Sequence, residues 1–265
     1  MFLTITLNKL QMKFTYLMIF LCVSVYSQKS IKITYEQLTS FRDGFFEGLP
    51  DSSREQTKKA MTSPMTFELF NNDKISLFKS AEVKDILIPS TEPSQAGVID
   101  RGTVLKLPEV WIMKDFKTEK TFAKRNIEEK NYYIQESFRK EEFIFTNEQK
   151  IIESFKCKMA YSLPKNKPND TIKYWYTDEI PIFDGPYYTV GIPGLILKYE
   201  RKNRVVYATK IEFFDKIITI DGLTKNIPIV TQKEFEIIKE KNTEPKSYTD
   251  ENGREIKTST QVIKP

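Results

Sequence analysis

Alternating apolar and polar residues dominate this chain and predict short antiparallel strands. The alternation is clean at Ile31–Tyr35, and the runs Met65–Phe70 and Ile75–Phe78 flank a polar turn, which predicts a hairpin. Further strands are predicted over 110–116, 118–124, 131–138, 155–161, 171–176, 195–199 and 205–214. Strands at intervals of about ten residues, joined by polar turns, are typical of an antiparallel sheet that curls.

Helix is predicted at few places. The best candidate is 231–241, where Thr231 can cap the helix and Glu234 completes a capping box. The charged stretch 51–59 has room for a helical turn, and 85–108, interrupted by prolines and glycines, predicts a long loop or an irregular crossing. The expected fold is mainly β with a minor α component. It is a single domain, a curved antiparallel sheet or partly open β-barrel with a C-terminal helix packed on it.

The N-terminus has the pattern of a secretory signal peptide. Lys9 and Lys13 precede an apolar run over 14–25, which is too short for a membrane span of about 20 residues. We predict cleavage after Ser27; a lipoprotein signal at Cys22 is the alternative, disfavoured by the bulky residues before it. The domain is then expected over 28–242. The polar segment 243–265 is expected to be a frayed C-terminal tail.

Charge and composition restrict the chemistry. The signal segment holds two of the 41 basic residues and no acid, so the mature chain has 39 basic and 36 acidic residues and a net charge of +3. This interspersed, mildly basic balance does not predict a nucleic-acid partner. The chain contains no histidine, which excludes an internal Ser-His-Asp or Cys-His arrangement and any His-ligated metal site.

The sequence predicts neither a cofactor nor a metal site. Cys157 is the only cysteine after cleavage, and its place in the alternating run 155–161 predicts a buried thiol on the apolar face of a strand. The acids nearest the central turns, Asp178, Glu179 and Asp184, keep open a calcium site of oxygen ligands, although turn capping or solvent exposure is the commoner role.

The stretch 175–199 concentrates glycines, prolines and aromatic residues between two predicted strands. We interpret it as a rigid double turn that leads into the buried strand 195–199. The residues of this structural turn motif are Asp184, Gly185, Pro186, Gly191, Pro193 and Gly194. The alternative is a binding loop. Its ligand-binding residues would be Trp175, Tyr176, Tyr187 and Tyr188.

The run Gly191-Ile-Pro-Gly-Leu-Ile196 resembles the signature of the GLPGLI family, with Ile192 in place of the usual leucine. The preceding Trp-Tyr-Thr and Asp-Gly-Pro tripeptides, and the segment around Cys157, resemble that family as well. The resemblance implies an exported protein of a Gram-negative envelope, located in the periplasm, associated with the outer membrane or secreted. The family has no assigned biochemical function, so the resemblance supplies no catalytic residues.

These observations favour a non-catalytic binding protein of the cell envelope that carries an apolar or lipid-like ligand. One alternative is an accessory protein for an outer-membrane transporter or secretion system, docked by strand addition at a sheet edge or through the C-terminal tail. A carboxylate-based hydrolase is a further alternative. The expected partners are an unknown ligand or an envelope protein, with peripheral contact to the outer membrane and no transmembrane span in the mature chain.

Overall fold

The computed structural model describes residues 30–49, 51–82, 85–94, 97–106, 109–164, 170–243, 246–249 and 255–258. The predicted signal peptide, its cleavage site and Cys22 lie outside the described residues. None of the helices in the described ranges is long and apolar enough to cross a membrane.

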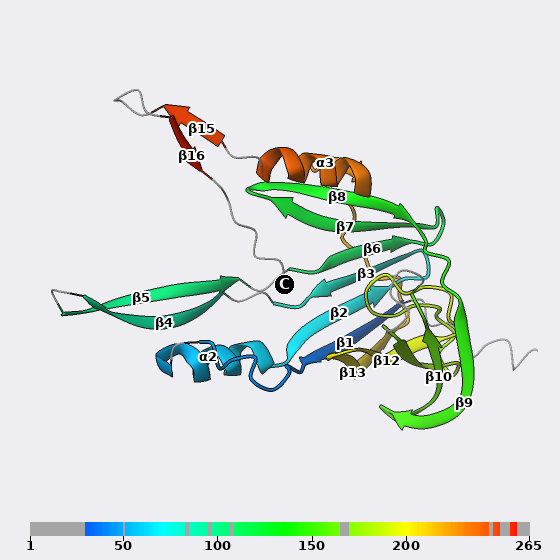
Figure 1. The fold of residues 1–265 in the computed structure, drawn as a ribbon. Coiled ribbons are helices and arrows are strands. Elements are labelled where there is room, and N and C mark those ends of the chain that lie inside the picture. The colour runs from blue at the N-terminus through cyan, green and yellow to red at the C-terminus, as the bar shows by residue number, and fades with distance from the viewer. Residues whose placement is uncertain are drawn as a thin grey trace, which may run out of the picture.

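The described residues form sixteen strands and two helices (Figure 1). The strands are β1 (Ser30–Thr39), β2 (Met65–Asn71), β3 (Ile75–Ser80), β4 (Asp85–Ser94), β5 (Gly97–Lys106), β6 (Trp111–Asp115), β7 (Lys120–Ile127), β8 (Lys130–Ser137), β9 (Phe143–Ile152), β10 (Phe155–Ser162), β11 (Ile172–Thr177), β12 (Leu195–Arg201), β13 (Arg204–Phe214), β14 (Ile229–Thr231), β15 (Lys246–Thr249) and β16 (Glu255–Thr258). The helices are α2 (Asp51–Thr62) and α3 (Gln232–Thr243).

One 12-stranded sheet organises the molecule, in the order β14-β8-β7-β6-β3-β2-β1-β13-β12-β11-β10-β9. All its pairs are antiparallel except β14 with β8. The sheet curves strongly, so β9 and β10 stand across the direction of β1 and β2 (Figure 1). Its two end strands do not pair with each other. The mainly β fold with a curved antiparallel sheet is confirmed, and the sheet is open.

The core follows from the alternation of side chains along each strand. Ile31, Ile33 and Tyr35 of β1 are fully buried on one face and belong to a large cluster that runs across the sheet from β3 to β10. This face is concave, and part of the cluster comes from the loop between β11 and β12. A smaller cluster of Leu77, Met113 and Phe122 lies on the other face, against Ile220 and Leu223.

Several local predictions are confirmed. The hairpin of β2 and β3 forms as expected, and α3 begins with the predicted capping box. Thr231 N donates to Glu234 Oε2 at 2.7 Å, and Glu234 N donates to Thr231 Oγ1 at 3.3 Å. Phe235 of α3 is buried beside Tyr132 of β8, which places the helix at that end of the sheet.

Other predictions need correction. Residues 85–106 are not an irregular loop, because β4 and β5 form a two-stranded ribbon; such a ribbon tolerates Pro89 and Pro93 since each of its strands has a free edge. The charged stretch 51–59 belongs to a complete helix, α2, and the sequence missed β9. Within the segment 243–265, expected to be a frayed tail, α3 ends at Thr243 and β15 pairs with β16.

Candidate functional site

The loop between β11 and β12 is a succession of tight turns closed by backbone hydrogen bonds. Ile182 N donates to Ile180 O at 2.8 Å, Asp184 N to Ile182 O at 3.0 Å, and Gly194 N to Ile192 O at 2.9 Å. Ile180 and Ile192 are buried in the core. The loop therefore packs onto the concave face of the sheet as part of the core.

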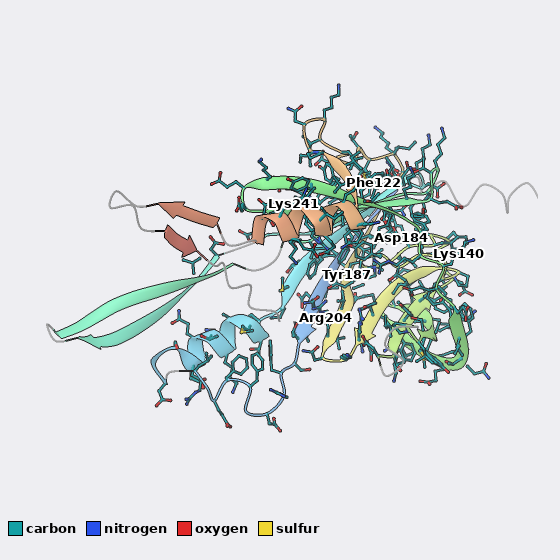
Figure 2. All side chains as sticks on the ribbon, turned by 45° about the horizontal axis from the view of Figure 1, so that its top comes forward. Phe122, Lys140, Asp184, Tyr187, Arg204 and Lys241 are labelled. Atoms are coloured by element: carbon teal, nitrogen blue, oxygen red, sulfur yellow. The ribbon has the colours of Figure 1, made fainter. Side chains whose placement is uncertain are left out.

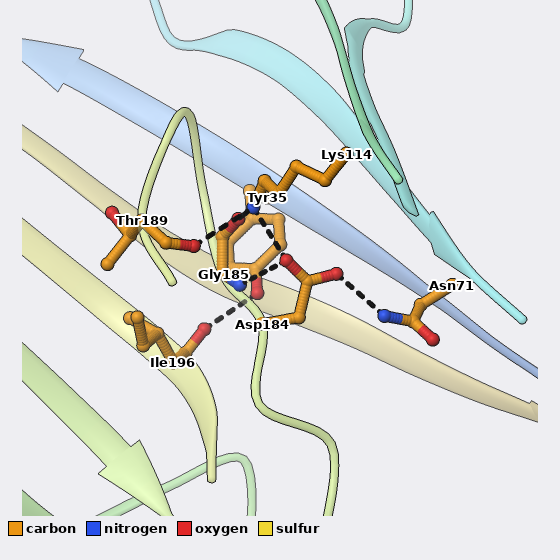
Figure 3. Close-up of polar contacts among 7 residues, drawn as sticks. All are labelled: Tyr35, Asn71, Lys114, Asp184, Gly185, Thr189 and Ile196. Carbon is orange, nitrogen blue, oxygen red and sulfur yellow. Dashed lines mark hydrogen bonds and ion pairs between the residues drawn. The ribbon is translucent and has the colours of Figure 1, made fainter. Parts of the chain in front are cut away.

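A buried ion pair fixes this loop to the sheet (Figure 3). Lys114 of β6 donates from Nζ to Asp184 Oδ1 at 2.6 Å, to Gly185 O at 2.7 Å and to Thr189 O at 3.1 Å. Both charged side chains are 0% exposed. An ammonium group has three hydrogens, so each of them has an acceptor here.

The remaining contacts of Asp184 reach β2 and β12, so that together with Lys114 of β6 the residue connects three strands (Figure 3). Asn71 of β2 donates from Nδ2 to Asp184 Oδ2 at 2.8 Å, and Gly185 N donates to Asp184 Oδ1 at 2.8 Å. The Asp184 carbonyl accepts from Ile196 N of β12 at 3.0 Å. The carboxylate is thus fully hydrogen-bonded, the condition under which a buried charge is tolerated.

Burial perturbs the titratable groups of this network. The pKa of Lys114 is lowered from its usual value by burial, and the negative charge of Asp184 opposes that shift. Burial also raises the pKa of Tyr35 well above its usual range, with a further contribution from Asp184. Tyr35 therefore stays a neutral donor, and its hydroxyl donates to Ile196 O at 2.6 Å.

The turn residues predicted from sequence lie within or beside this network. Gly185 is in contact with Ile196, and Pro186 accepts a hydrogen bond from Thr189 N. Gly191 and Gly194 have φ of +90° and +146°, a region that favours glycine, and Pro193 lies between them.

Trp175 and Tyr176 are neighbours on β11 and are both largely buried. Trp175 donates from Nε1 to Glu200 Oε1 at 3.2 Å, and Lys150 Nζ lies 3.6 Å from the centre of the Trp175 ring. The ring of Tyr176 lies against Phe145 of β9, with centres 6.0 Å apart.

Tyr187 and Tyr188 are adjacent in the loop but have different surroundings. The partly buried Tyr187 ring packs 5.0 Å from Phe78 and 5.5 Å from Tyr199, and its hydroxyl donates to Gln37. Tyr188 accepts a hydrogen bond from Arg125 Nη2 at 3.1 Å. Trp175 and Tyr176 therefore have different partners although they are consecutive on β11, Tyr187 packs in the core, and the four aromatic residues do not gather around one opening.

Two hollows in the described residues are lined by other side chains. A groove of about 1000 Å³ lies between α2 and the start of β2, and a smaller one of about 350 Å³ lies beside the start of β8. The first is lined by Glu55, Gln56, Lys59, Ala60, Ser63, Pro64, Met65, Thr66, Ala81 and Glu82. None of the predicted aromatic residues lines either hollow.

The acids considered for calcium have separate partners. Asp178 Oδ2 lies 2.5 Å from Lys158 Nζ, and this hydrogen bond lowers the pKa of Asp178. Glu179 accepts from Lys156 N, while Asp184 is in the buried network. Within the described ranges, no cluster of three or more Cys, Asp or Glu residues is arranged to hold a metal ion.

The prediction of a buried thiol is confirmed. Cys157 is fully buried in the core, and burial raises its pKa to about 11. The thiol is therefore almost entirely protonated at neutral pH and is a poor nucleophile.

The pH dependence of stability tests the surroundings of Lys150 on β9. Burial, followed by the like charge of Lys198, lowers the pKa of Lys150 to about 8. Between pH 8 and the usual pKa near 10.5, the unfolded chain binds a proton that the folded protein does not, so this group makes stability rise with pH. Urea denaturation of the wild type and Lys150→Gln should show that the substitution removes this rise between pH 8 and 10. Parallel curves for the two proteins over that interval would contradict the assignment.

Asp184 was predicted as a turn residue, but neither Lys114 nor its pairing with Asp184 was predicted from the sequence. Lys114 belongs to a predicted strand, Val110–Phe116, and occupies the same side as the buried Ile112. A lysine at an apolar position of an alternating strand was the available signal. Its partner Asp184, 70 residues away along the chain, could not be paired with it from one sequence.

The fold and this network define the molecule as a β-sheet module whose central loop is fixed by an internal ion pair. Residues 71–234 match the family described as "N-glycanase peptide, N-terminal domain", and because the match covers more than half of the chain, the chain belongs to that family.

Two solved structures of PNGF-II, in space groups P21 and C2, are similar in fold. Their TM-scores are 0.52 and 0.50, both are 16% identical in sequence, and the matches cover 84% and 83% of this chain. The matches cover 37% and 35% of those chains, so this chain spans little more than a third of their length. At this identity the similarity shows the fold alone. No curated protein matches the sequence.

Proposed function

We propose that the protein is an exported, non-catalytic binding module that docks a partner protein by strand addition along β9. The observation that carries this proposal is the free edge of the sheet. β9 is ten residues long and ends the strand order, with no strand on its outer side among the described residues. Unpaired backbone groups along such an edge are a template for an added strand.

The side chains of β9 determine what kind of partner segment fits this edge. Ile144, Phe145 and Ile151 are 46%, 51% and 73% exposed, while the middle of the strand, 146–150, is polar. The pairing of β9 with β10 shifts register around this polar middle, which marks a bulge. The fitting partner is an extended segment with apolar side chains toward both ends and polar side chains between them.

A carrier of an apolar ligand is less well supported by the geometry. The concave face that would hold such a ligand is filled by the loop between β11 and β12, and Tyr187 packs there against Phe78 and Tyr199. Opening that space would require the buried pair of Lys114 and Asp184 to separate. Separating the pair would leave two buried charges without partners, and the free-energy cost of doing so favours the accessory role over the carrier role.

The family assignment supports the non-catalytic part of the proposal. The matching family is described as the N-terminal domain of an N-glycanase, and most of each solved relative lies outside the match. We extend the proposal to an exported protein of a Gram-negative envelope, cleaved after Ser27. Kinship with the GLPGLI family, based on Gly191–Ile196, is part of the same proposal.

Site-specific crosslinking tests the docking edge. A photoreactive amino acid at Gln149 or Ile151, both exposed on β9, is expected to give an adduct with one partner protein in the native envelope. Because strands pair residue by residue, the two adducts should map to partner residues two positions apart. The same probe at Ile217, which is 60% exposed and lies outside β9, is the control and should give no such adduct.

A charge placed on β9 should reduce binding of the partner protein. Ile151→Lys should weaken the partner's binding at least tenfold, whereas Ile217→Lys should leave it unchanged, because both sites are exposed and only one is on the edge. Adducts scattered over unrelated partner sites, or equal binding by both variants, would overturn the proposal.

A further inference from the structure

We propose that Arg125, Tyr188 and Arg139 form a binding site for an oxyanion group, such as a sulfate, phosphate or carboxylate, carried by a ligand. The site is separate from β9 and does not depend on the docking proposal. Tyr188 lies in the loop between β11 and β12, Arg125 lies on β7, and Arg139 follows the end of β8.

Both guanidinium groups contact the same tyrosine. Arg125 Nη2 donates to the Tyr188 hydroxyl at 3.1 Å, and Arg125 Nη1 donates to Lys124 O at 2.9 Å. Arg139 lies over the face of the ring, with its Cζ 4.7 Å from the ring centre. Two planar groups that recognise oxyanions through paired N–H donors are therefore held on one side chain.

The hydroxyl of Tyr188 adds a third donor. A phenol can accept and donate at the same time, and here its oxygen accepts from Arg125. Within the described part of the chain, its own hydrogen has no recorded acceptor. An anion beside Arg125 would therefore have guanidinium N–H donors and the Tyr188 O–H donor within reach.

The charges around the site leave positive potential available. Arg125 forms no ion pair with any acid in the described ranges. Arg139 pairs with Glu136 at 2.9 Å, but Arg139 is 54% exposed and exposed ion pairs are weak, so an anion can compete for it. Lys140, which follows Arg139 in the chain, is exposed and adds a positive charge (Figure 2). The acid in contact with the site is Glu136, through its pair with Arg139.

The site is held in place by the buried network. Tyr188 lies between Tyr187, which packs in the core, and Thr189, whose carbonyl accepts from Lys114 at 3.1 Å. The backbone on both sides of Tyr188 is therefore fixed before any ligand arrives. A site that needs no reordering loses less affinity on binding.

Calorimetric titration of the full chain with sodium sulfate, phosphate or acetate, at ionic strength held constant with chloride, tests the site. At least one of these anions should bind saturably, with a Kd on the order of 1 mM. Binding of sulfate and phosphate alone would identify a tetrahedral group, and binding of acetate would identify a carboxylate.

Matched variants separate the site from general charge effects. Arg125→Gln and Tyr188→Phe should each weaken the anion at least tenfold, and Tyr188→Phe changes no charge and keeps the ring. Arg42→Gln removes an equal charge from an exposed arginine elsewhere and should have no effect. The Arg125 Nε–Hε NMR signal should also shift on anion addition. Absence of saturable binding for all three anions, or equal affinity of Tyr188→Phe and the wild type, would overturn the proposal.

Discussion

Replacing Lys114 by methionine is expected to lower the free energy of unfolding by about 3 to 5 kcal/mol, the cost of removing one partner of a buried ion pair. The substitution keeps most of the side-chain volume, so the loss arises mainly from the Asp184 carboxylate, which remains buried without its cation. Two backbone carbonyls, of Gly185 and Thr189, lose a donor as well. Urea denaturation followed by circular dichroism measures the change.

Two further variants show whether the pair is the cause. Lys117→Met, at an exposed position just beyond β6, should alter stability by no more than about 0.5 kcal/mol. The double variant Lys114→Met with Asp184→Asn should cost less than the sum of its single substitutions, because neither charge is then left alone. A cost below about 1 kcal/mol for Lys114→Met would show that the network is not important for stability.

Gly194→Ala should destabilise the protein by more than about 2 kcal/mol. Gly194 has a φ of +146°, and an added Cβ would lie 2.2 Å from the carbonyl oxygen of Thr177. That oxygen belongs to the backbone at the end of β11, so the strand itself would have to move. Thermal unfolding of the variant should show a large fall in Tm.

Gly222→Ala is the matched control for Gly194→Ala. A Cβ at Gly222 would meet no atom within 4 Å, and its φ is not in the left-handed region, so its Tm should stay close to that of the wild type. Equal Tm values for the two variants would show that the contact with Thr177 is not a constraint on the loop.

Local patterns in the sequence predicted the parts of the fold that depend on neighbouring residues. Thr231 and Glu234 predicted the start of α3, because a capping box joins residues three apart. The alternation in β1 and β2 predicted their buried faces, because each of these strands has the core on one side.

The features that sequence analysis missed depend on contacts between distant residues. β9 has polar residues at 146–150 because it is an edge strand, and its alternation is too weak to detect. The strand pattern around Lys114 offered a weak local signal of its burial, but nothing local to either residue shows that Lys114 and Asp184 form a buried pair. The four aromatic residues of the predicted binding loop were adjacent in pairs along the chain, but β11 and the loop direct them into different surroundings.

The two ends of the sheet differ in what they offer to another strand. β14 is three residues long, pairs in parallel with β8 and leads directly into α3, so this end has almost no length available for pairing. β9 at the other end is ten residues long. Edge-to-edge assembly into long fibres requires two usable ends on every molecule. Among the described residues, the 12-stranded sheet therefore has one long edge, and β9 can pair directly with one strand of a partner.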